Sequence, residues 1–128
     1  MFTPAELPIG CSANAPFSDD IWEVPIDLTG LSILMQVRMF PGAEGDPLID
    51  LSSAMAAPAD RIEIIMTSAS YSQFRPVIAE ETLDGLPKSG RAGKPVTFAH
   101  DILIGAAGFE RPFLFGDFTV KPGVTRNA

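Results

Sequence analysis

The chain has very few of the residues that build disulfides, metal sites and catalytic clusters. Its 128 residues include one cysteine, one histidine, one tryptophan and one tyrosine. With Cys11 alone no intramolecular disulfide is possible, and small secreted domains more often carry paired cysteines, so we expect synthesis in a reducing cytoplasm. One histidine and one cysteine are too few for a structural zinc site unless carboxylates join them. We expect a buried, inert thiol and no cofactor.

Long apolar runs are also missing. No run approaches the ~20 residues that cross a bilayer as a helix. Residues 1–10 lack a charged region followed by a continuous apolar stretch, so we expect no signal peptide. These features predict that the chain has no membrane partner.

Basic residues are scarce as well. Nine Lys and Arg stand against 16 Asp and Glu, which gives a formal charge of −7. The basic residues are dispersed, whereas neutralising a phosphate backbone takes clustered lysine and arginine. We therefore expect no nucleic-acid partner, and we interpret the acidity as an aid to solubility.

What the chain does have is the composition of a folded β protein. Hydrophobic residues make up 46% and charged residues 20%, as in a globular domain. The 12 prolines and 11 glycines are scattered without a period, which favours many turns between short strands over long helices. The length suits one domain.

The clearest element is a long strand over residues 31–40. Apolar residues occupy every second position from Leu31 to Met39, which buries one face of a strand and exposes the other. Asp27 and Gly30 supply a turn before it. Because residues 21–26 alternate in the same way, we predict a hairpin across this turn.

Further runs complete an all-β pattern. Residues 48–51, 61–67, 96–104 and 112–120 read as strands, and residues 6–9 suit a short edge strand. The sequence predicts seven or eight short strands in an antiparallel β-sandwich, Ig-like or jelly-roll-like, with a partly open barrel as the alternative.

Residues 68–81 are ambiguous. Their apolar residues have helical spacing, but Pro76 interrupts them. We predict a short helix ahead of Pro76 and a strand after it, hence at most one short helix near 70–81. The predicted organisation is an extended arm over 1–19, a sandwich over 20–121 and a tail over 122–128.

No group of residues in the sequence indicates a catalytic site. His100 and Asp101 are neighbours in a predicted strand, so they point to opposite faces, and His100 shares the apolar parity. The acids Asp19, Asp20 and Glu23 could collect a hard cation, but exposed acids near a turn usually meet only water. We expect no catalytic residues, no bound metal and no enzymatic activity.

Three pieces of the chain resemble a known family. They are the turn at 25–30 with the Met-Gln-Val-Arg of 35–38, the Phe-Ala-His-Asp-Ile of 98–102, and the closing Gly-Asp-Phe-Thr-Val-Lys-Pro-Gly-Val-Thr-Arg of 116–126. In this order they resemble small β-sandwich proteins of tailed-bacteriophage and prophage tail modules, and the N-terminal domain of phage baseplate upper proteins opens in a similar way. The chain departs from that pattern at His100, where an aromatic residue is usual, and over 68–81.

The resemblance implies a structural component of a tailed-phage virion, in the tail, the baseplate or the fibre attachment. Such a protein would be found in the virion, assembled in the host cytoplasm, and would contact copies of itself and neighbouring virion proteins as a homo-oligomer. Contacts of this kind need apolar patches that assembly covers. The candidate interface residues lie in the strand at 112–120 and in the N-terminal arm: Phe113, Leu114, Phe115, Phe118, Leu7 and Ile9.

Two alternatives stay open. One is a protein that decorates the head surface. The other is a carbohydrate-binding module for host-surface recognition, in which Trp22 and Tyr71 would stack on a ligand. Trp22 is otherwise expected to anchor the core.

Overall fold

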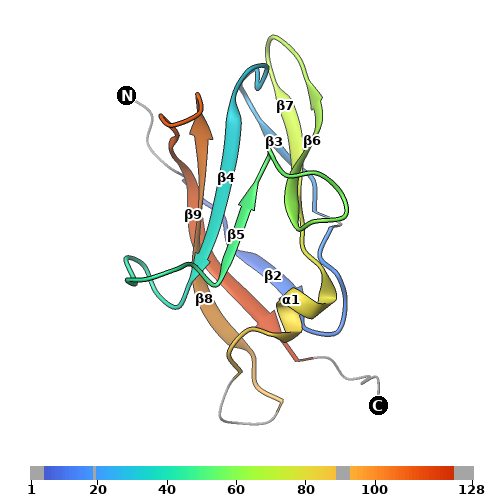
Figure 1. Ribbon diagram of the computed structural model, residues 1–128, viewed down its shortest axis with the longest axis vertical. Coiled ribbons are helices and arrows are strands. Elements are labelled where there is room, and N and C mark those ends of the chain that lie inside the picture. Colours follow the sequence, from blue (N-terminus) through green and yellow to red (C-terminus); the bar gives the residue numbers. More distant parts are fainter. Residues whose placement is uncertain (1–4, 19, 89–92, 123–128) are drawn as a thin grey trace.

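Two β-sheets pack face to face in the computed structural model, which describes residues 5–18, 20–88 and 93–122 (Figure 1). The larger sheet has the order β1-β9-β8-β4-β5, with β2 also paired to β9, and the smaller sheet has the order β3-β7-β6. Every pairing is antiparallel except those of β1 and β2, which run parallel to β9. The predicted all-β antiparallel sandwich is confirmed.

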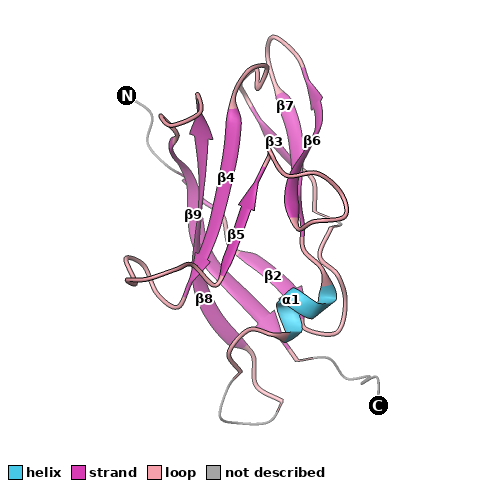
Figure 2. Cartoon of the chain, viewed as in Figure 1, coloured by secondary structure: helices cyan, strands magenta, loops and turns pink. Residues whose placement is uncertain are grey.

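The described elements are nine strands and one short helix, whereas the sequence predicted seven or eight strands. Their bounds are β1 Ala5–Glu6, β2 Ile9–Ser12, β3 Trp22–Val24, β4 Ser32–Arg38, β5 Ile49–Ser52, β6 Arg61–Thr67, β7 Ser72–Val77, α1 Glu80–Asp84, β8 Val96–Gly105 and β9 Arg111–Lys121. Figure 2 shows α1 beside the end of the sandwich, as the only helix of the described part of the chain.

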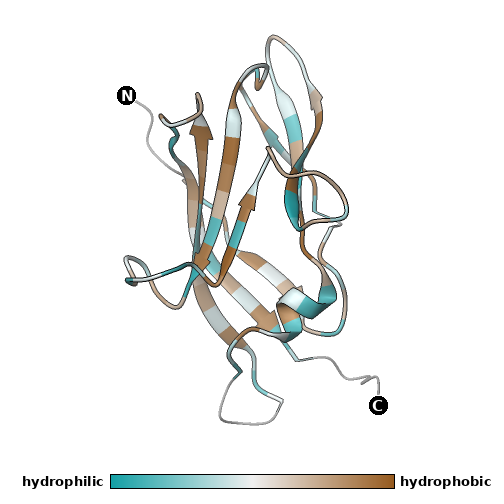
Figure 3. Ribbon diagram, in the orientation of Figure 1, coloured by the Kyte–Doolittle hydropathy of each residue, from teal (hydrophilic) through white to brown (hydrophobic). Residues whose placement is uncertain are grey.

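Strands β4 and β8 form the centre of the larger sheet. Met35 pairs with Ile102 and Val37 with His100, so residues of one parity face the smaller sheet. All four of these side chains are buried, and the intervening residues face away from the smaller sheet. Figure 3 shows the hydrophobic bands that recur along the strands of this sheet. The predicted parity is therefore confirmed within both strands. It fails at Met39, which lies beyond the end of β4 and is exposed.

The predicted hairpin across the Asp27–Gly30 turn is wrong. β3 pairs with β7 in the smaller sheet, whereas β4 lies in the larger sheet, so the turn crosses between the two layers. Leu28 is buried at the crossing, and its backbone N–H lies 3.0 Å from Thr67 Oγ1 and 3.1 Å from Ser72 Oγ. The Asp27 carboxylate accepts hydrogen bonds from the backbone N–H of Thr29 and the hydroxyl of Thr67. Polar contacts to β6 and β7 thus fix the turn across the layers.

The order of helix and strand predicted around Pro76 is reversed. Ser72, Phe74 and Pro76 are buried on one face of β7, and the helix follows at Glu80–Asp84. Phe74 pairs with Trp22, and β3 extends no further along β7 than that pair. Pro76 therefore lies where β7 has β6 alone as a strand partner, a position that suits a residue without an N–H group.

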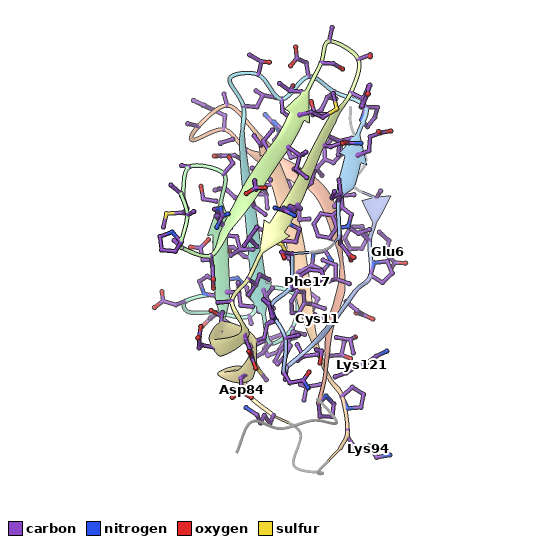
Figure 4. All side chains as sticks on the ribbon, turned by 90° about the vertical axis from the view of Figure 1, so that its right-hand side faces the viewer. Glu6, Cys11, Phe17, Asp84, Lys94 and Lys121 are labelled. Atoms are coloured by element: carbon purple, nitrogen blue, oxygen red, sulfur yellow. The ribbon has the colours of Figure 1, made fainter. Side chains whose placement is uncertain are left out.

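Strands β1 and β2, which lie within the predicted N-terminal arm, are part of the larger sheet. Ile9 pairs with Phe118 and Cys11 with Val120, and all four side chains are buried. Phe17 is also buried and makes an isolated bridge to Ile78. Figure 4 shows Cys11 and Phe17 directed into the interior. The predicted boundary at 19 and 20 accordingly does not separate these residues from the core, and most of the tail predicted at 122–128 lies outside the described residues.

Candidate functional site

The outer face of the larger sheet, turned away from the smaller sheet, carries a row of polar and aromatic side chains. The strand registers place Gln36 of β4 opposite Asp101 of β8, Asp101 opposite Phe115 of β9, and Phe115 opposite Glu6 of β1. Neighbours in such a row lie close enough for their side chains to interact. Four strands therefore bring two carboxylates, an amide and a phenyl ring into one line.

A second row runs beside the first. Arg38 of β4 lies opposite Ala99 of β8, and Ala99 lies opposite Asp117 of β9. The small side chain of Ala99 leaves a hollow between the two charged residues. The loop that follows β4 brings Phe40 to the same place.

These rows and the loop enclose an open groove of about 430 Å³, which we call the outer-face groove. The residues that define its chemistry are Glu6, Arg38, Phe40, Asp101, Phe115 and Asp117. Phe40 is 62% exposed, and Phe115 is 44% exposed. Two phenyl rings thus meet solvent beside three carboxylates and one guanidinium.

Arg38 is held by the loop that follows β4. One guanidinium nitrogen, Nη1, donates to the carbonyls of Ala43 at 3.0 Å and Gly45 at 2.6 Å. The other, Nη2, donates to the side-chain oxygen of Gln36 at 3.1 Å. Arg38 therefore holds the loop, and both of its terminal nitrogens already donate hydrogen bonds within the chain.

Asp101 is half-buried in the groove. Burial raises the pKa of its carboxyl group, and the nearby charges of His100 and Arg38 oppose that rise. No side chain of the described residues donates a hydrogen bond to this carboxylate.

His100 lies behind Asp101, on the inner face of β8, as the sequence predicts. Its side chain is 4% exposed, and its Nε2 atom lies 2.6 Å from the carbonyl oxygen of Leu7. Because a carbonyl only accepts, Nε2 carries the proton, and the buried Nδ1 has no hydrogen-bond partner within the described residues. Burial lowers the pKa of His100, although the bond to Leu7 and the charges of Asp101 and Asp117 oppose that effect. This is the environment of a neutral structural histidine.

The predicted interface residues do not share one surface. Ile9, Phe113 and Phe118 are buried in the core of the single chain, so the prediction that they offer side chains to a partner is wrong. Leu7 and Leu114 are partly buried and pack against that core. Only Phe115 of the predicted set is exposed, and it lies in the outer-face groove.

A register shift explains the error on β9. The pairing with β8 shifts between Ile102, which lies opposite Leu114, and Leu103, which lies opposite Pro112. One extra residue reverses the parity of every residue beyond it. Phe113 and Phe115 therefore do not share a face, although strict alternation predicts that they do.

Trp22 and Tyr71 do not form a stacking platform. Trp22 is partly buried and makes an edge-to-face contact with Phe74, with ring centroids 5.6 Å apart and an interplanar angle of 79°. Trp22 lies opposite Phe74, which is buried on the same face of β7 as Ser72. Tyr71 is 38% exposed and comes directly before Ser72, so it has the opposite parity to the face on which Trp22 packs. The expectation that Trp22 anchors the core agrees with this contact.

Other candidate clusters have structural partners. Glu63 forms ion pairs with Arg61 at 3.0 Å and Arg75 at 2.8 Å on the smaller sheet. Lys88 forms an ion pair with Asp84. Within the described ranges no three His, Cys, Asp or Glu residues are grouped to hold a metal, and none of the helices found there could cross a bilayer. Asp19, one of the acids that the sequence singled out, lies outside the described residues.

Sequence reasoning missed most of the groove. Gln36 and Arg38 have the outward parity of a strand, but that parity is typical of any solvated face. Gln36 and Arg38 lie near Asp101 and Glu6 because of the strand order in the sheet, and the sequence alone does not predict that order. The one local sequence signal of the groove was Phe40, an aromatic residue followed by a proline and a glycine. Its side chain is exposed in the structure.

No protein-family model matches the chain, and no curated protein sequence is similar to it.

Proposed function

We propose that this protein is a structural component of a tailed-bacteriophage virion, in the tail, the baseplate or the fibre attachment, and that it works through contacts with other proteins. The family resemblance of residues 25–38, 98–102 and 116–126 motivates the phage assignment. The described parts of these segments lie on or next to β4, β8 and β9, the strands that build the outer-face groove.

The observation that carries a contact function is the outer-face groove itself. A solvated sheet face normally carries isolated apolar side chains among polar ones. Here Phe40, Phe115 and the 48% exposed Met39 gather around one hollow. Apolar side chains gathered around a hollow and rimmed by charged residues are typical of a surface that a partner covers.

The direct test is the composition of purified particles. We expect mass spectrometry of virions from the phage or prophage that encodes the chain to find it at a stoichiometry that fits a symmetric assembly. Light scattering on the purified chain would give its oligomeric state. Particles that lack the chain at every stage of purification would overturn the proposal.

A further inference from the structure

The outer-face groove has an excess of negative charge. Glu6, Asp101 and Asp117 contribute three carboxylates, and Arg38 contributes one guanidinium. Arg38 donates to the loop carbonyls and to Gln36, and it makes no ion pair of 4.0 Å or less with a described carboxylate. The groove is thus electrostatically complementary to a cation that comes from outside.

Asp101 identifies the place of that cation. Its carboxylate lies midway across the sheet, half-buried, without a side-chain donor among the described residues. A carboxylate that has lost part of its hydration is stabilised most by a group that carries both a positive charge and N–H donors. Lysine and arginine side chains are such groups.

The phenyl rings add a second requirement. Phe115 lies next to Asp101 in the register, and Phe40 borders the same hollow. Phenyl faces bind the aliphatic stems of lysine and arginine, attract their cationic heads, and cover neighbouring apolar side chains. The groove therefore suits a basic residue in an apolar setting better than a free cation.

We propose that the outer-face groove receives a segment of another protein in which a lysine or arginine is flanked by apolar residues. The cation would contact Asp101, with Asp117 and Glu6 at its sides, and the apolar flanks would cover Phe115 and Phe40. This inference rests on the contact function proposed above and specifies the chemistry of the partner.

A different protein fits better than a second copy of this chain. Arg38 is held by its loop, Arg61 and Arg75 by Glu63, and Lys88 by Asp84, so among the described basic residues only Lys94, Arg111 and Lys121 are available to a second copy. The chain also carries a net charge of −7, so its copies repel one another at long range. A neutral glycan fits less well, because it would bring no charge to Asp101.

The test is a titration of the full-length ¹⁵N-labelled protein, followed by NMR. The probe is an acetylated and amidated Leu-Arg-Leu-Arg-Leu peptide, and the matched peptide has glutamine in place of arginine. We expect the arginine peptide to shift the amide signals of Gln36, Asp101, Phe115 and Asp117, and the glutamine peptide to leave them in place. Asp101→Asn should weaken binding about tenfold, the loss of one charge-assisted contact.

Asp50→Asn is the control variant. Asp50 of β5 lies opposite Gln36, in the same row of the same face, but does not line the groove. We expect it to bind like the wild type, whereas Phe115→Ala should weaken binding without removing charge. Thermal melting of each variant confirms that it is folded.

Four outcomes would overturn the inference. They are equal binding of both peptides, shifts confined to other surfaces, unchanged binding by Asp101→Asn, and shifts of the groove by maltohexaose but not by the arginine peptide. Self-association that Asp101→Asn abolishes, without peptide binding, would likewise reject it in favour of a second copy.

The same variants separate this inference from the proposed function. If the chain is present in virions and Asp101→Asn particles assemble and infect like the wild type, the groove inference fails and the structural role stands. If the chain is absent from virions, the structural role fails, and the peptide titration alone decides the chemistry of the groove.

Discussion

His100 of β8 donates a hydrogen bond to the carbonyl oxygen of Leu7, at 2.6 Å, across the intervening strand β9. The residue of β9 that pairs with His100 is Gly116. A side chain at that position would stand between the imidazole and Leu7, so the missing Cβ makes the bond possible. One histidine and one glycine thereby fix the N-terminal edge of the larger sheet.

Gly116→Ala should destabilise the protein by at least about 1–3 kcal/mol, the usual cost of overpacking, because the φ of +156° at Gly116 adds backbone strain. A Cβ at residue 116 would lie 2.7 Å from the carbonyl oxygen and 3.0 Å from the carbonyl carbon of Leu7. These are backbone atoms, so relief requires β1 to move away from β9 and the bond to His100 to break. Chemical denaturation measures the loss.

Gly10→Ala is the matched control for that substitution. Gly10 lies in β2 on the same edge of the sheet, and a Cβ there meets nothing within 4 Å. We expect its free energy of unfolding to stay within about 0.5 kcal/mol of the wild type. Equal losses in the two variants would show that contact with Leu7 is not the cause.

The protein should lose stability as the pH falls below about 6.5, the ordinary pKa of histidine. Burial lowers the pKa of His100 in the folded state, so the unfolded chain takes up a proton first. The contribution of neutral His100 is complete above the unfolded pKa and is lost as the pH falls toward the folded pKa. One proton changes the free energy of unfolding by at most about 1.4 kcal/mol per pH unit.

Denaturation curves between pH 7.5 and 5.5 measure this slope. His100→Gln keeps an N–H donor near Leu7 but does not titrate in this range, so its slope should be shallower than that of the wild type. Identical slopes would assign the acid sensitivity to other groups. The carboxylates of Asp27, Glu63 and Glu110, whose pKa values hydrogen bonds lower, contribute only further toward acid.

Phe118→Ala and Phe115→Ala should behave differently although the residues lie three positions apart. Phe118 is fully buried between the sheets, and its truncation should cost about 3–5 kcal/mol. Phe115 is 44% exposed, and its truncation should cost less than about 1.5 kcal/mol in the isolated chain. Thermal unfolding of the two variants compares them directly. Similar losses would contradict the register of β9 described above.

The fold class and the buried faces of β4 and β8 could be predicted because strict alternation specifies both. The crossing at Asp27–Gly30 could not, because a turn signal states that the chain reverses but not which sheet receives the next strand. Phe113 escaped prediction for a similar reason, since its register shift depends on contacts between distant strands. The outer-face groove combines both difficulties, because its residues come from β1, β4, β8, β9 and a loop.

Ser72→Ala tests the crossing. The buried Ser72 hydroxyl donates to the carbonyl of Ile26 at 2.9 Å and accepts from the backbone N–H of Leu28 at 3.1 Å. Removing it leaves the partly buried carbonyl of Ile26 without this donor, so we expect a loss of about 1–3 kcal/mol in the free energy of unfolding. Ser70→Ala, at an exposed residue of the β6–β7 turn, should be near neutral. An equal effect of the two substitutions would remove the crossing as the explanation.

Cys11 should resist alkylation in the folded protein. Burial, with a smaller effect of Asp20, raises the pKa of its thiol to about 11. At pH 8 only about a thousandth of such thiols are ionised, and the thiolate is the reactive form. Iodoacetamide should therefore modify Cys11 slowly in buffer and quickly in guanidinium chloride, as followed by mass spectrometry.

The same labelling tests whether β1 and β2 leave the sheet together. Cys11 of β2 pairs with Val120 of β9, while the disturbance in Gly116→Ala acts on Leu7, between β1 and β2. If both strands open as one unit, Gly116→Ala should speed the labelling of Cys11 under native conditions. Labelling as slow as in the wild type, in a variant that is measurably destabilised, would show that Leu7 detaches while β2 stays paired with β9.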